Sequence, residues 1–425
     1  MVDFTIETQY DLLKEHYDKT LNRDTNLVET SNDVPTPITC IEEMVGKIPE
    51  KVWKNATLRI LDPCCGCGNF FFVIYNKLVR YHSPQHILEN MLYFNDINDN
   101  RLNQVRKIFG IKDYKLNIFR RSFLDFTPDD QGMYDIVVAN PPYAKLMDNG
   151  KRASKNHNLI GVFINKTLEI LNPNGLLLYI TPDNWMSCAD RNEIITTLTT
   201  LRIIHLNIHT AKRYFPGVGS SFTWYLVQKS KPTKHIEVSG TWNKQEYTSK
   251  IPSGPRTYIP LYYTNLVHSI LSKTIDNAEL PKYKVETSSD LHKYTKKALI
   301  SSTENGEYQH RLIHTPSQTV YASRPHKWQD GYKVFIGLTS YYNIFVDNCG
   351  MTQSIGFIRM PSPEEAESTC EVLKHPIYKF INNICRWGNF NNVRILQKFP
   401  KYEGELEQIY DFFGITEAEK QIINA

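Results

Sequence analysis

The chain has 425 residues, of which 41% are hydrophobic, 12% aromatic and 22% charged, and its formal net charge is +4. This length predicts two domains, and the mild basic excess permits nucleic-acid binding without indicating it. No apolar run reaches the roughly eighteen residues of a membrane span, and the first residues are neither basic nor apolar enough for a signal peptide.

Alternating apolar and amphipathic segments predict an α/β fold up to about residue 230. We expect helices over residues 7–21, 69–80, 99–109, 158–171 and 189–200. We expect strands over residues 58–62, 91–96, 115–119, 134–139, 175–180, 202–208 and 222–228. Strands that alternate with helices predict a mostly parallel, seven-stranded sheet with helices on both faces. The polar stretch 230–234 predicts a boundary between domains 1–232 and 233–425, and the pattern beyond it is irregular until helices return over 363–413.

A loop of small residues, 62–68 (DPCCGCG), follows the first strand and precedes an apolar helix. Gly66 and Gly68 allow a ligand to approach the backbone closely, and the start of a helix favours a carboxylate or phosphate. The glycine spacing matches neither the dinucleotide fingerprint nor the P-loop. Asp96 ends the second strand, where an acid can bind ribose hydroxyls. The predicted ligand is therefore a nucleoside with a charged, amino-acid-like end rather than a pyrophosphate.

Asn140-Pro141-Pro142-Tyr143 stands directly after the strand 134–139. Two prolines cannot continue a strand, so they fix a stiff loop at the strand's carboxyl end, where open α/β sheets bind ligands. The amide of Asn140 and nearby backbone carbonyls can accept from a planar NH2 group, and the Tyr143 ring can stack on a flat base. The alternative is an ordinary strand-to-loop turn. Together with the upstream loop, these residues predict a site that holds an exocyclic amine for alkylation.

Three of the eight cysteines, Cys64, Cys65 and Cys67, lie in the glycine loop. A Cys-x-x-Cys pattern can indicate zinc or redox chemistry, but no second pair at a zinc spacing follows. The histidines between residues 310 and 326 match no zinc pattern either. We therefore interpret the three cysteines as small residues that fill the loop, and we expect no metal. Scattered, unpaired cysteines are typical of a reducing cytosol.

Taken together, these segments resemble the gamma class of S-adenosylmethionine-dependent N6-adenine DNA methyltransferases, of which the TaqI-type enzymes are members. The resemblance depends on four segments: VPTPI at 34–38, DPCCGCGNF at 62–70, NPPY at 140–143, and a late motif at 214–222. It covers about residues 20–230. It implies a Rossmann-like methyltransferase domain, S-adenosylmethionine as cofactor, and a following α+β domain that recognises DNA.

The resemblance also implies roles for the matching residues. Asn140 and the Pro141 carbonyl, in the loop that Pro142 stiffens, would accept from the target amine. Tyr143 and Phe215 would stack on a flipped adenine. The cofactor would be held by Thr36, Pro37, Asp62, Cys64, Gly66, Asp96, Ser122, Phe123 and Asn140. Ser122 stands where the family usually has an Asp for the cofactor's adenine amine, so either Ser122 accepts in its place or Asp125 reaches it.

Two basic segments are candidates for DNA contact. The first is the loop 145–157, which contributes Lys145, Lys151, Arg152 and Lys155. The second is the stretch 372–402, which lacks Asp and Glu and contains Arg386, Trp387 and Arg394. Basic residues beside Asn and aromatic residues suit contacts to phosphates and base edges. The alternative for the second segment is a solvated helix face with a packed Trp.

The expected activity is methyl transfer from S-adenosylmethionine to N6 of adenine at a specific sequence in double-stranded DNA, by base flipping and direct transfer. The expected role is the modification enzyme of a restriction-modification system, a cytoplasmic monomer of bacterial, phage or viral origin, and the sequence leaves open whether a separate cognate restriction endonuclease is its partner. Protein-glutamine methyltransferases also use Asn-Pro-Pro-Tyr, and RNA adenine methyltransferases are a second alternative. A catalytically inactive DNA-binding relative is the non-enzymatic alternative. We find no nuclease pattern of the form Pro-Asp…Glu-x-Lys.

Overall fold

The computed structural model describes residues 4–27, 34–143, 159–190, 192–216, 221–339 and 341–425. The chain packs as two compact units, one of residues 1–185 and 192–256 and the other of residues 186–191 and 257–425. Two strands that follow residue 232, β8 (His235–Trp242) and β9 (Gln245–Pro252), pair with the sheet of the first unit. The first unit therefore extends to residue 256.

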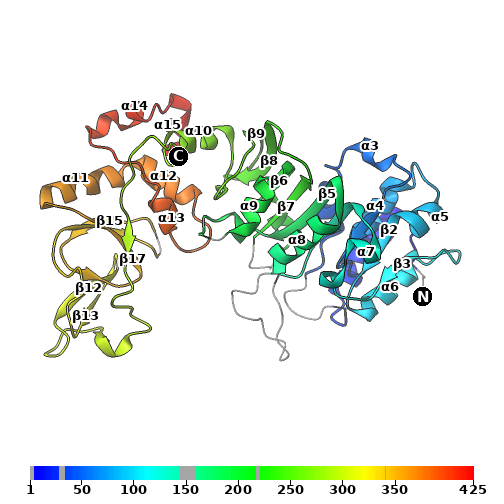
Figure 1. Ribbon diagram of the computed structural model, residues 1–425, viewed down its shortest axis with the longest axis horizontal. Helices are drawn as coiled ribbons and strands as arrows, with labels where there is room; N and C mark the ends of the chain where they lie inside the picture. Colours follow the sequence, from blue (N-terminus) through cyan, green and yellow to red (C-terminus); the bar gives the residue numbers. More distant parts are fainter. Residues whose placement is uncertain (1–3, 28–33, 144–158, 191, 217–220, 340) are drawn as a thin grey trace. The chain divides into compact units, whose positions relative to one another are not determined.

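The first unit is built on a nine-stranded sheet with the order β3-β2-β1-β4-β5-β7-β6-β8-β9, blue to green in Figure 1. The other strands are β1 (Ile60–Asp62), β2 (Leu92–Asn95), β3 (Asn117–Phe119), β4 (Tyr134–Ala139), β5 (Leu171–Pro182), β6 (Arg202–Ile208) and β7 (Phe222–Gln228). The five neighbouring strands β3-β2-β1-β4-β5 are parallel to one another, and β6 is parallel to β8. Strands β7 and β9 run antiparallel to their neighbours. The expected strands are all present, but the sheet is mixed and has nine strands rather than seven, because the hairpin β8–β9 pairs with the edge of β6.

Helices cover both faces of this sheet, as the alternation of strands and helices predicts. They are α1 (Tyr10–Lys19), α2 (Ile38–Val45), α3 (Glu50–Trp53), α4 (Asn69–Leu78), α5 (Pro84–His86), α6 (Asp99–Phe109), α7 (Pro128–Gln131), α8 (Leu159–Ile170) and α9 (Glu193–Thr199). Val138 and its strand partner Leu178 belong to the core that contains α2 and α4. The next residue, Tyr179, points to the opposite face, because side chains alternate along a strand, and its hydroxyl lies 2.5 Å from Oγ1 of Thr167 in α8.

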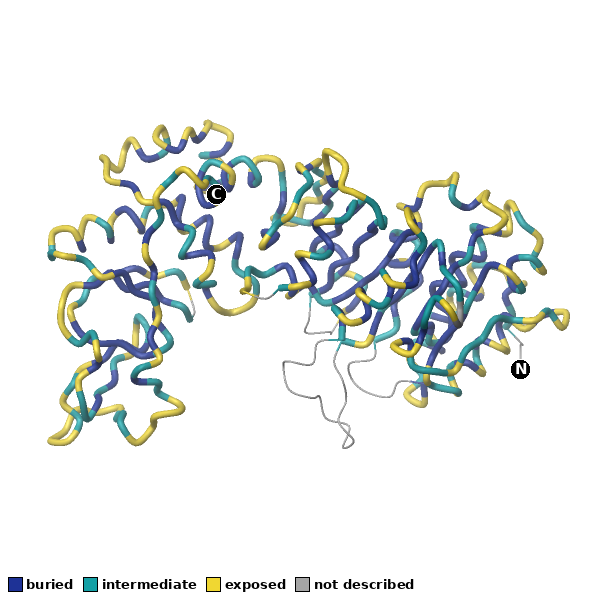
Figure 2. Tube along the Cα trace, in the orientation of Figure 1, coloured by how far each residue is buried: buried dark blue, intermediate teal, exposed yellow. Residues whose placement is uncertain are grey.

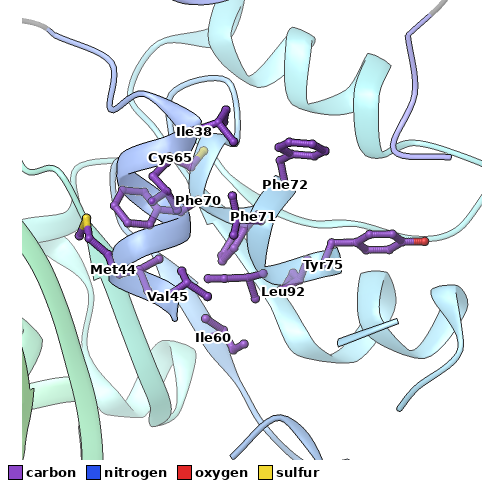
Figure 3. Packing of buried hydrophobic residues seen from close by; sticks show 14 of the residues in the cluster. Ile38, Met44, Val45, Ile60, Cys65, Phe70, Phe71, Phe72, Tyr75 and Leu92 are labelled. Atoms are coloured by element: carbon purple, nitrogen blue, oxygen red, sulfur yellow. The ribbon is translucent and has the colours of Figure 1, made fainter. Parts of the chain in front are cut away.

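The core beside the glycine loop consists of apolar side chains from two helices and two strands (Figure 3). Its labelled members are Ile38, Met44, Val45, Ile60, Cys65, Phe70, Phe71, Phe72, Tyr75 and Leu92. Helix α4 is apolar on nearly every face and is buried along most of its length, which is typical of a helix inside a core. Because α4 begins directly after the glycine loop, this packing also fixes the position of the loop.

Gly68, the residue before α4, has a left-handed φ of 89°. A Cβ atom at this position would lie 2.6 Å from Cε2 of Phe109, at the end of α6. Only glycine therefore combines this backbone conformation with such close packing of α4 against α6.

The second unit contains both helices and sheets. One sheet has the order β10-β17-β14-β15 and the other β11-β13-β12-β16. The strands are β10 (Glu286–Thr287), β11 (Ile300–Ser301), β12 (His310–Thr315), β13 (Gln318–Ala322), β14 (Lys333–Gly337), β15 (Ile344–Asp347), β16 (Gly350–Met351) and β17 (Ile355–Arg359). The helices are α10 (Asn265–Lys273), α11 (Pro363–Lys374), α12 (Pro376–Ile384), α13 (Val393–Leu396), α14 (Ile409–Phe412) and α15 (Glu417–Ile423). Strands β14 and β17 are largely buried, whereas many connecting loops are exposed (Figure 2).

Among the described residues, no helix combines the length and the apolar character that crossing a membrane requires.

Candidate functional site

A cavity lies at the carboxyl ends of β1 and β4, between which the strand order changes direction. Open α/β sheets bind their ligands at this position. The empty space of the cavity, including open solvent at its mouth, is about 560 Å³. Its walls are the glycine loop, the start of α4, the residue after β4 and part of the segment 21–36. The lining residues are Leu21, Asn22, Leu27, Val34, Pro35, Thr36, Asp62, Cys64, Cys65, Gly66, Cys67, Asn69, Phe70, Arg101 and Asn140.

The structure brings many of the expected cofactor-binding residues together in this wall. These are Thr36, Asp62, Cys64, Gly66 and Asn140. Asp96 adjoins them, since its Oδ2 accepts from the N–H of Gly66 at 2.9 Å and its Oδ1 from the N–H of Asn98 at 2.8 Å. Pro37 immediately precedes α2 and is half-buried.

Ser122 and Phe123 lie outside the wall of the cavity. Oγ of Ser122 accepts from the N–H of Leu124 at 3.2 Å and caps a short 3-10 turn. The Phe123 ring is buried against two other rings, with centroid distances of 5.5 Å to Phe126 and 5.2 Å to Phe163. The expected contact of Phe123 with the cofactor's adenine stays a prediction.

The cavity contains buried acid and thiol groups. Asp62 is 1% exposed, and its Oδ1 accepts from the N–H of Cys64 at 3.1 Å. Burial raises the pKa of the Asp62 carboxyl, and the nearby carboxylate of Asp96 raises it further. Burial likewise raises the pKa of the Cys64 thiol, which donates to the Asn140 carbonyl at 3.4 Å. Burial raises the pKa of Cys67 to about 12, so these loop cysteines behave as small protonated side chains rather than thiolates.

Three features of the wall fit a cationic ligand with an amino-acid end. Asp62 lies near the carboxylate of Asp96, and a cation bound beside the two groups would lower the raised pKa of Asp62 and stabilise its charged form. Oγ1 of Thr36 is buried without a hydrogen-bond partner among the described residues, so a ligand can supply one. Gly66 has a φ of 55°, and an added Cβ would meet no atom within 4 Å, so the space beside it is open to a ligand.

The amide of Asn140 is held in a defined orientation. Its Nδ2 donates to the carbonyl of Val34 at 2.8 Å, and its Oδ1 accepts from the hydroxyl of Tyr143. Val34 belongs to the same short segment as Thr36, so the loop after β4 and the segment before α2 are directly linked. Burial raises the pKa of the Tyr143 phenol, which therefore stays protonated and donates rather than acting as a base.

The two rings expected to stack on a base share one neighbour, Phe222, the first residue of β7. Its ring centroid lies 6.0 Å from that of Tyr143 and 4.5 Å from that of Phe215. Phe215 is 2% exposed. Between the end of β4 and Tyr143, Pro141 is buried and Pro142 is exposed. The structure thus gathers an amide and three aromatic rings at this edge of the sheet.

Sequence reasoning missed Asn22, Asn69 and Arg101, which also line the cavity. Nδ2 of Asn69 donates to Oδ1 of Asn22 at 2.8 Å and to the carbonyl of Thr36 at 3.0 Å. Nε of Arg101 donates to the carbonyl of Leu27 at 2.7 Å, and its guanidinium lies 3.8 Å from Asp96. An amide at the start of an otherwise apolar helix was a signal for Asn69, whereas Asn22 and Arg101 had no local signal.

The expected DNA contacts fall into two groups. Lys145, Lys151, Arg152 and Lys155 lie outside the described residues. In the second unit, Arg386 donates to the carbonyl of Asn389 at 2.7 Å, and Nε1 of Trp387 donates to the carbonyl of Ile259 at 2.8 Å. Arg394 forms an ion pair with Asp190.

The glycine loop follows β1, and β8 and β9 extend the strand order β3-β2-β1-β4-β5-β7-β6 at one edge of the sheet. Residues 53–212 match the family model described as Eco57I restriction-modification methylase. This segment contains both the glycine loop and Asn140-Pro141-Pro142-Tyr143, so both lie within the matched region.

The chain is also similar to two curated proteins. The type II methyltransferase M.VspI of Vibrio sp. (strain 343) is 25% identical over 161 residues, which cover 35% of this chain and 37% of that protein. The type II restriction enzyme and methyltransferase RM.BcgI of Heyndrickxia coagulans is 27% identical over 231 residues, which cover 50% of this chain and 33% of that protein. The chain thus matches about a third of the length of each relative.

Among solved structures, the ATP-dependent Type ISP restriction-modification enzyme LlaBIII bound to DNA is similar with a TM-score of 0.52 and 11% identity. The similarity covers 100% of this chain and 41% of that one. At this identity it shows a shared fold and nothing of substrate or partner.

Proposed function

We propose that the protein is a restriction-modification methyltransferase that transfers a methyl group from S-adenosylmethionine to N6 of adenine at a specific sequence in double-stranded DNA. The observation that carries the proposal is that Asn140, the amide of the Asn-Pro-Pro-Tyr loop, lines the same cavity as Asp62, Cys64 and Gly66 of the glycine loop. An amine acceptor therefore borders the pocket that fits a cofactor. When bound, S-adenosylmethionine supplies an electrophilic methyl group on its sulfonium sulfur.

Residues of the wall suit the parts of that cofactor. The buried carboxyl of Asp62 would pair with the ammonium group, and Oγ1 of Thr36 would bond to the amino-acid end. The open space beside Gly66 would admit the ligand next to the backbone. Each oxygen of Asp96 already accepts one backbone N–H, and a carboxylate oxygen has a further lone pair for a ribose hydroxyl.

The chemistry that remains for the protein is to orient and activate an amine. The lone pair of an aromatic amine is conjugated into the ring, so the amine is a poor nucleophile. Oδ1 of Asn140 and the carbonyl of Pro141 would accept its two protons and favour a tetrahedral nitrogen. Positioned acceptors of this kind act through electrostatics and orientation rather than as a strong base. The bond from Nδ2 to the Val34 carbonyl fixes the amide so that Oδ1 is the atom available to the substrate.

The target adenine would have to leave the duplex, at a cost of roughly a few kcal/mol. Tyr143 would stack on the extruded base, with Phe215 and Phe222 forming the apolar side of the pocket. The Tyr143 hydroxyl now occupies Oδ1 of Asn140, so base entry would displace that hydroxyl or add the amine to the second lone pair of Oδ1.

We assign different functions to the two units. The first contains the cavity and would perform the chemistry, whereas the second, residues 257–425 with 186–191, would recognise the DNA sequence. In a restriction-modification system the protein would act as the modification enzyme beside a separate cognate endonuclease.

Methyl transfer from labelled S-adenosylmethionine tests the proposal. The purified chain is incubated with plasmid DNA, RNA or protein, and labelled DNA is digested to nucleosides. We expect label in N6-methyl-2′-deoxyadenosine from DNA. Label in methylated cytosine refutes the adenine assignment, and label only in RNA or in glutamine side chains refutes the substrate.

A further inference from the structure

The two most exposed large apolar side chains among the described residues are Tyr341, at 85%, and Phe390, at 65%. Both lie in the second unit, on adjacent loops. Tyr341 is in the loop between β14 and β15, and Phe390 is between α12 and α13. An antiparallel bridge joins Thr339 to Phe390, so the two loops run side by side.

These loops are firmly attached to the unit beneath them. Asn391 is 3% exposed, its N–H donates to the carbonyl of Leu338 at 2.9 Å, and its Nδ2 donates to the carbonyl of Gly337 at 2.7 Å. Tyr342, the neighbour of Tyr341, donates from its hydroxyl to the carbonyl of Leu373 at 2.8 Å. Described residues beside each of the two rings are thus hydrogen-bonded to the rest of the unit, and two exposed rings on neighbouring loops form a candidate interaction site.

The two sequence segments that contain these rings have no acidic residue. No Asp or Glu occurs in residues 331–346 or 372–402. The exposed polar neighbours in the same loops are the amides of Asn343 and Asn389, and Arg386 holds the Asn389 carbonyl at 2.7 Å. Amides suit base edges and aromatic rings suit apolar groups in the major groove such as the thymine methyl, whereas phosphates require several cations.

We propose that Tyr341 and Phe390 contact base pairs of bound duplex DNA, with Asn343 and Asn389 beside them at base edges. This inference rests on the proposed function, and it shifts recognition away from two residues that the sequence favoured. Arg394 is paired with Asp190, and the Trp387 indole bonds to the Ile259 carbonyl, so neither presents its polar group freely to a groove. Base contact by rings predicts a loss that depends on DNA sequence and not on salt.

The test uses the full chain and a short duplex carrying the site that nucleotide-resolution mapping shows to be methylated by the wild type. Tyr341→Ala and Phe390→Ala are each expected to weaken binding to this duplex by about tenfold or more. Binding to a shuffled duplex and the slope of affinity against salt should stay unchanged. Tyr341→Phe keeps the ring and should bind as the wild type does. Tyr294→Ala is the matched control, since Tyr294 is 61% exposed on another loop of the same unit.

The outcomes separate this inference from the proposed function. A wild type that methylates no DNA overturns the proposed function. A wild type that methylates DNA while both alanine variants bind like Tyr294→Ala overturns only this inference. An equal loss on cognate and shuffled duplexes also overturns it. Sedimentation of the free protein completes the test, because a wild-type dimer that Phe390→Ala converts to monomer assigns the rings to a second copy of the chain instead.

Discussion

Removing the hydroxyl of Tyr143 tests how Asn140 is used. In the structure this hydroxyl donates to Oδ1 of Asn140, the atom proposed to accept from the target amine. Tyr143→Phe deletes that donor and keeps the ring. If the hydroxyl competes with the substrate, the variant should not lose catalytic efficiency and should gain some.

The size of the gain follows from the bond that is lost. A neutral hydrogen bond contributes about 0.5–1.5 kcal/mol net. If base entry must break the whole bond, Tyr143→Phe raises kcat/KM for DNA by roughly two- to tenfold. If the amine uses the second lone pair of Oδ1, kcat/KM stays unchanged. Tyr143→Ala also removes the stacking surface, which contributes about 1–3 kcal/mol per base, and should lower kcat/KM by roughly five- to 150-fold.

Single-turnover methylation of a cognate duplex measures these effects directly, and a 2-aminopurine at the target position reports base extrusion. Tyr214→Phe is the matched control. Its hydroxyl donates to Glu43 at 2.7 Å in the same unit, and Tyr214 does not line the cavity. A double-mutant cycle with Asn140→Ala should show that the effect of Tyr143→Phe disappears when the acceptor is absent.

A hundredfold loss in Tyr143→Phe with an unchanged fluorescence signal would refute this reasoning. It would assign the hydroxyl to the reaction itself, as a donor that the transition state needs. Equal behaviour of Tyr143→Phe and Tyr143→Ala would show that the ring does not stack on the base.

Three further predictions concern other parts of the first unit. Asn140→Ala should lower turnover by about a hundredfold or more, near 3 kcal/mol, with little change in cofactor affinity by calorimetry; near-normal turnover contradicts the mechanism. Asn69→Ala releases the carbonyl of Thr36, so it should raise the dissociation constant for S-adenosylmethionine by about tenfold, whereas Asn76→Ala in the same helix should not. Burial lowers the pKa of His205 to about 4 in the folded chain. Between about pH 6.5 and 4, His205 is therefore protonated in the unfolded chain and neutral in the folded chain. The free energy of unfolding should therefore fall between about pH 6.5 and 4, by on the order of 3 kcal/mol, and His205→Gln should flatten this part of a denaturant-measured profile.

The elements of the first sheet were predictable because their signals are local. The strand 134–139 and the helix 99–109 have the bounds that their apolar spacing and flanking residues indicate. The start of α4 is encoded by the left-handed glycine at 68 and the apolar run after it. Each of these signals depends on a few neighbouring residues, and tertiary packing reinforces it.

The remaining parts depend on contacts between distant residues. The hairpin β8–β9 has exposed, polar positions along much of its length, and it belongs to the sheet because β6 offers an edge to pair with. The segment 21–36 shows no periodic pattern, yet its described residues, 21–27 and 34–36, contribute to one wall of the cavity, where Leu27, Val34 and Thr36 are among the lining residues. This wall depends on contacts with Asn69 after the glycine loop and with Arg101 of α6, both distant in sequence.

The same distinction applies to the DNA-recognition surface, for which the contacts expected at Arg386, Trp387 and Arg394 stay predictions. A sequence shows that 372–402 is free of acids, but it cannot show which of its cations are already paired, and Arg394 is paired with Asp190 from a segment 204 positions away. Exposure of an aromatic ring is equally invisible, since Tyr341 and Tyr342 are adjacent and only one of them is anchored to Leu373. Phosphate contacts supply affinity for any DNA, whereas discrimination between sequences requires groups that meet the bases. A unit that recognises sequence must therefore present side chains without internal partners, and among the described residues Tyr341 and Phe390 expose the largest fractions of large apolar side chains.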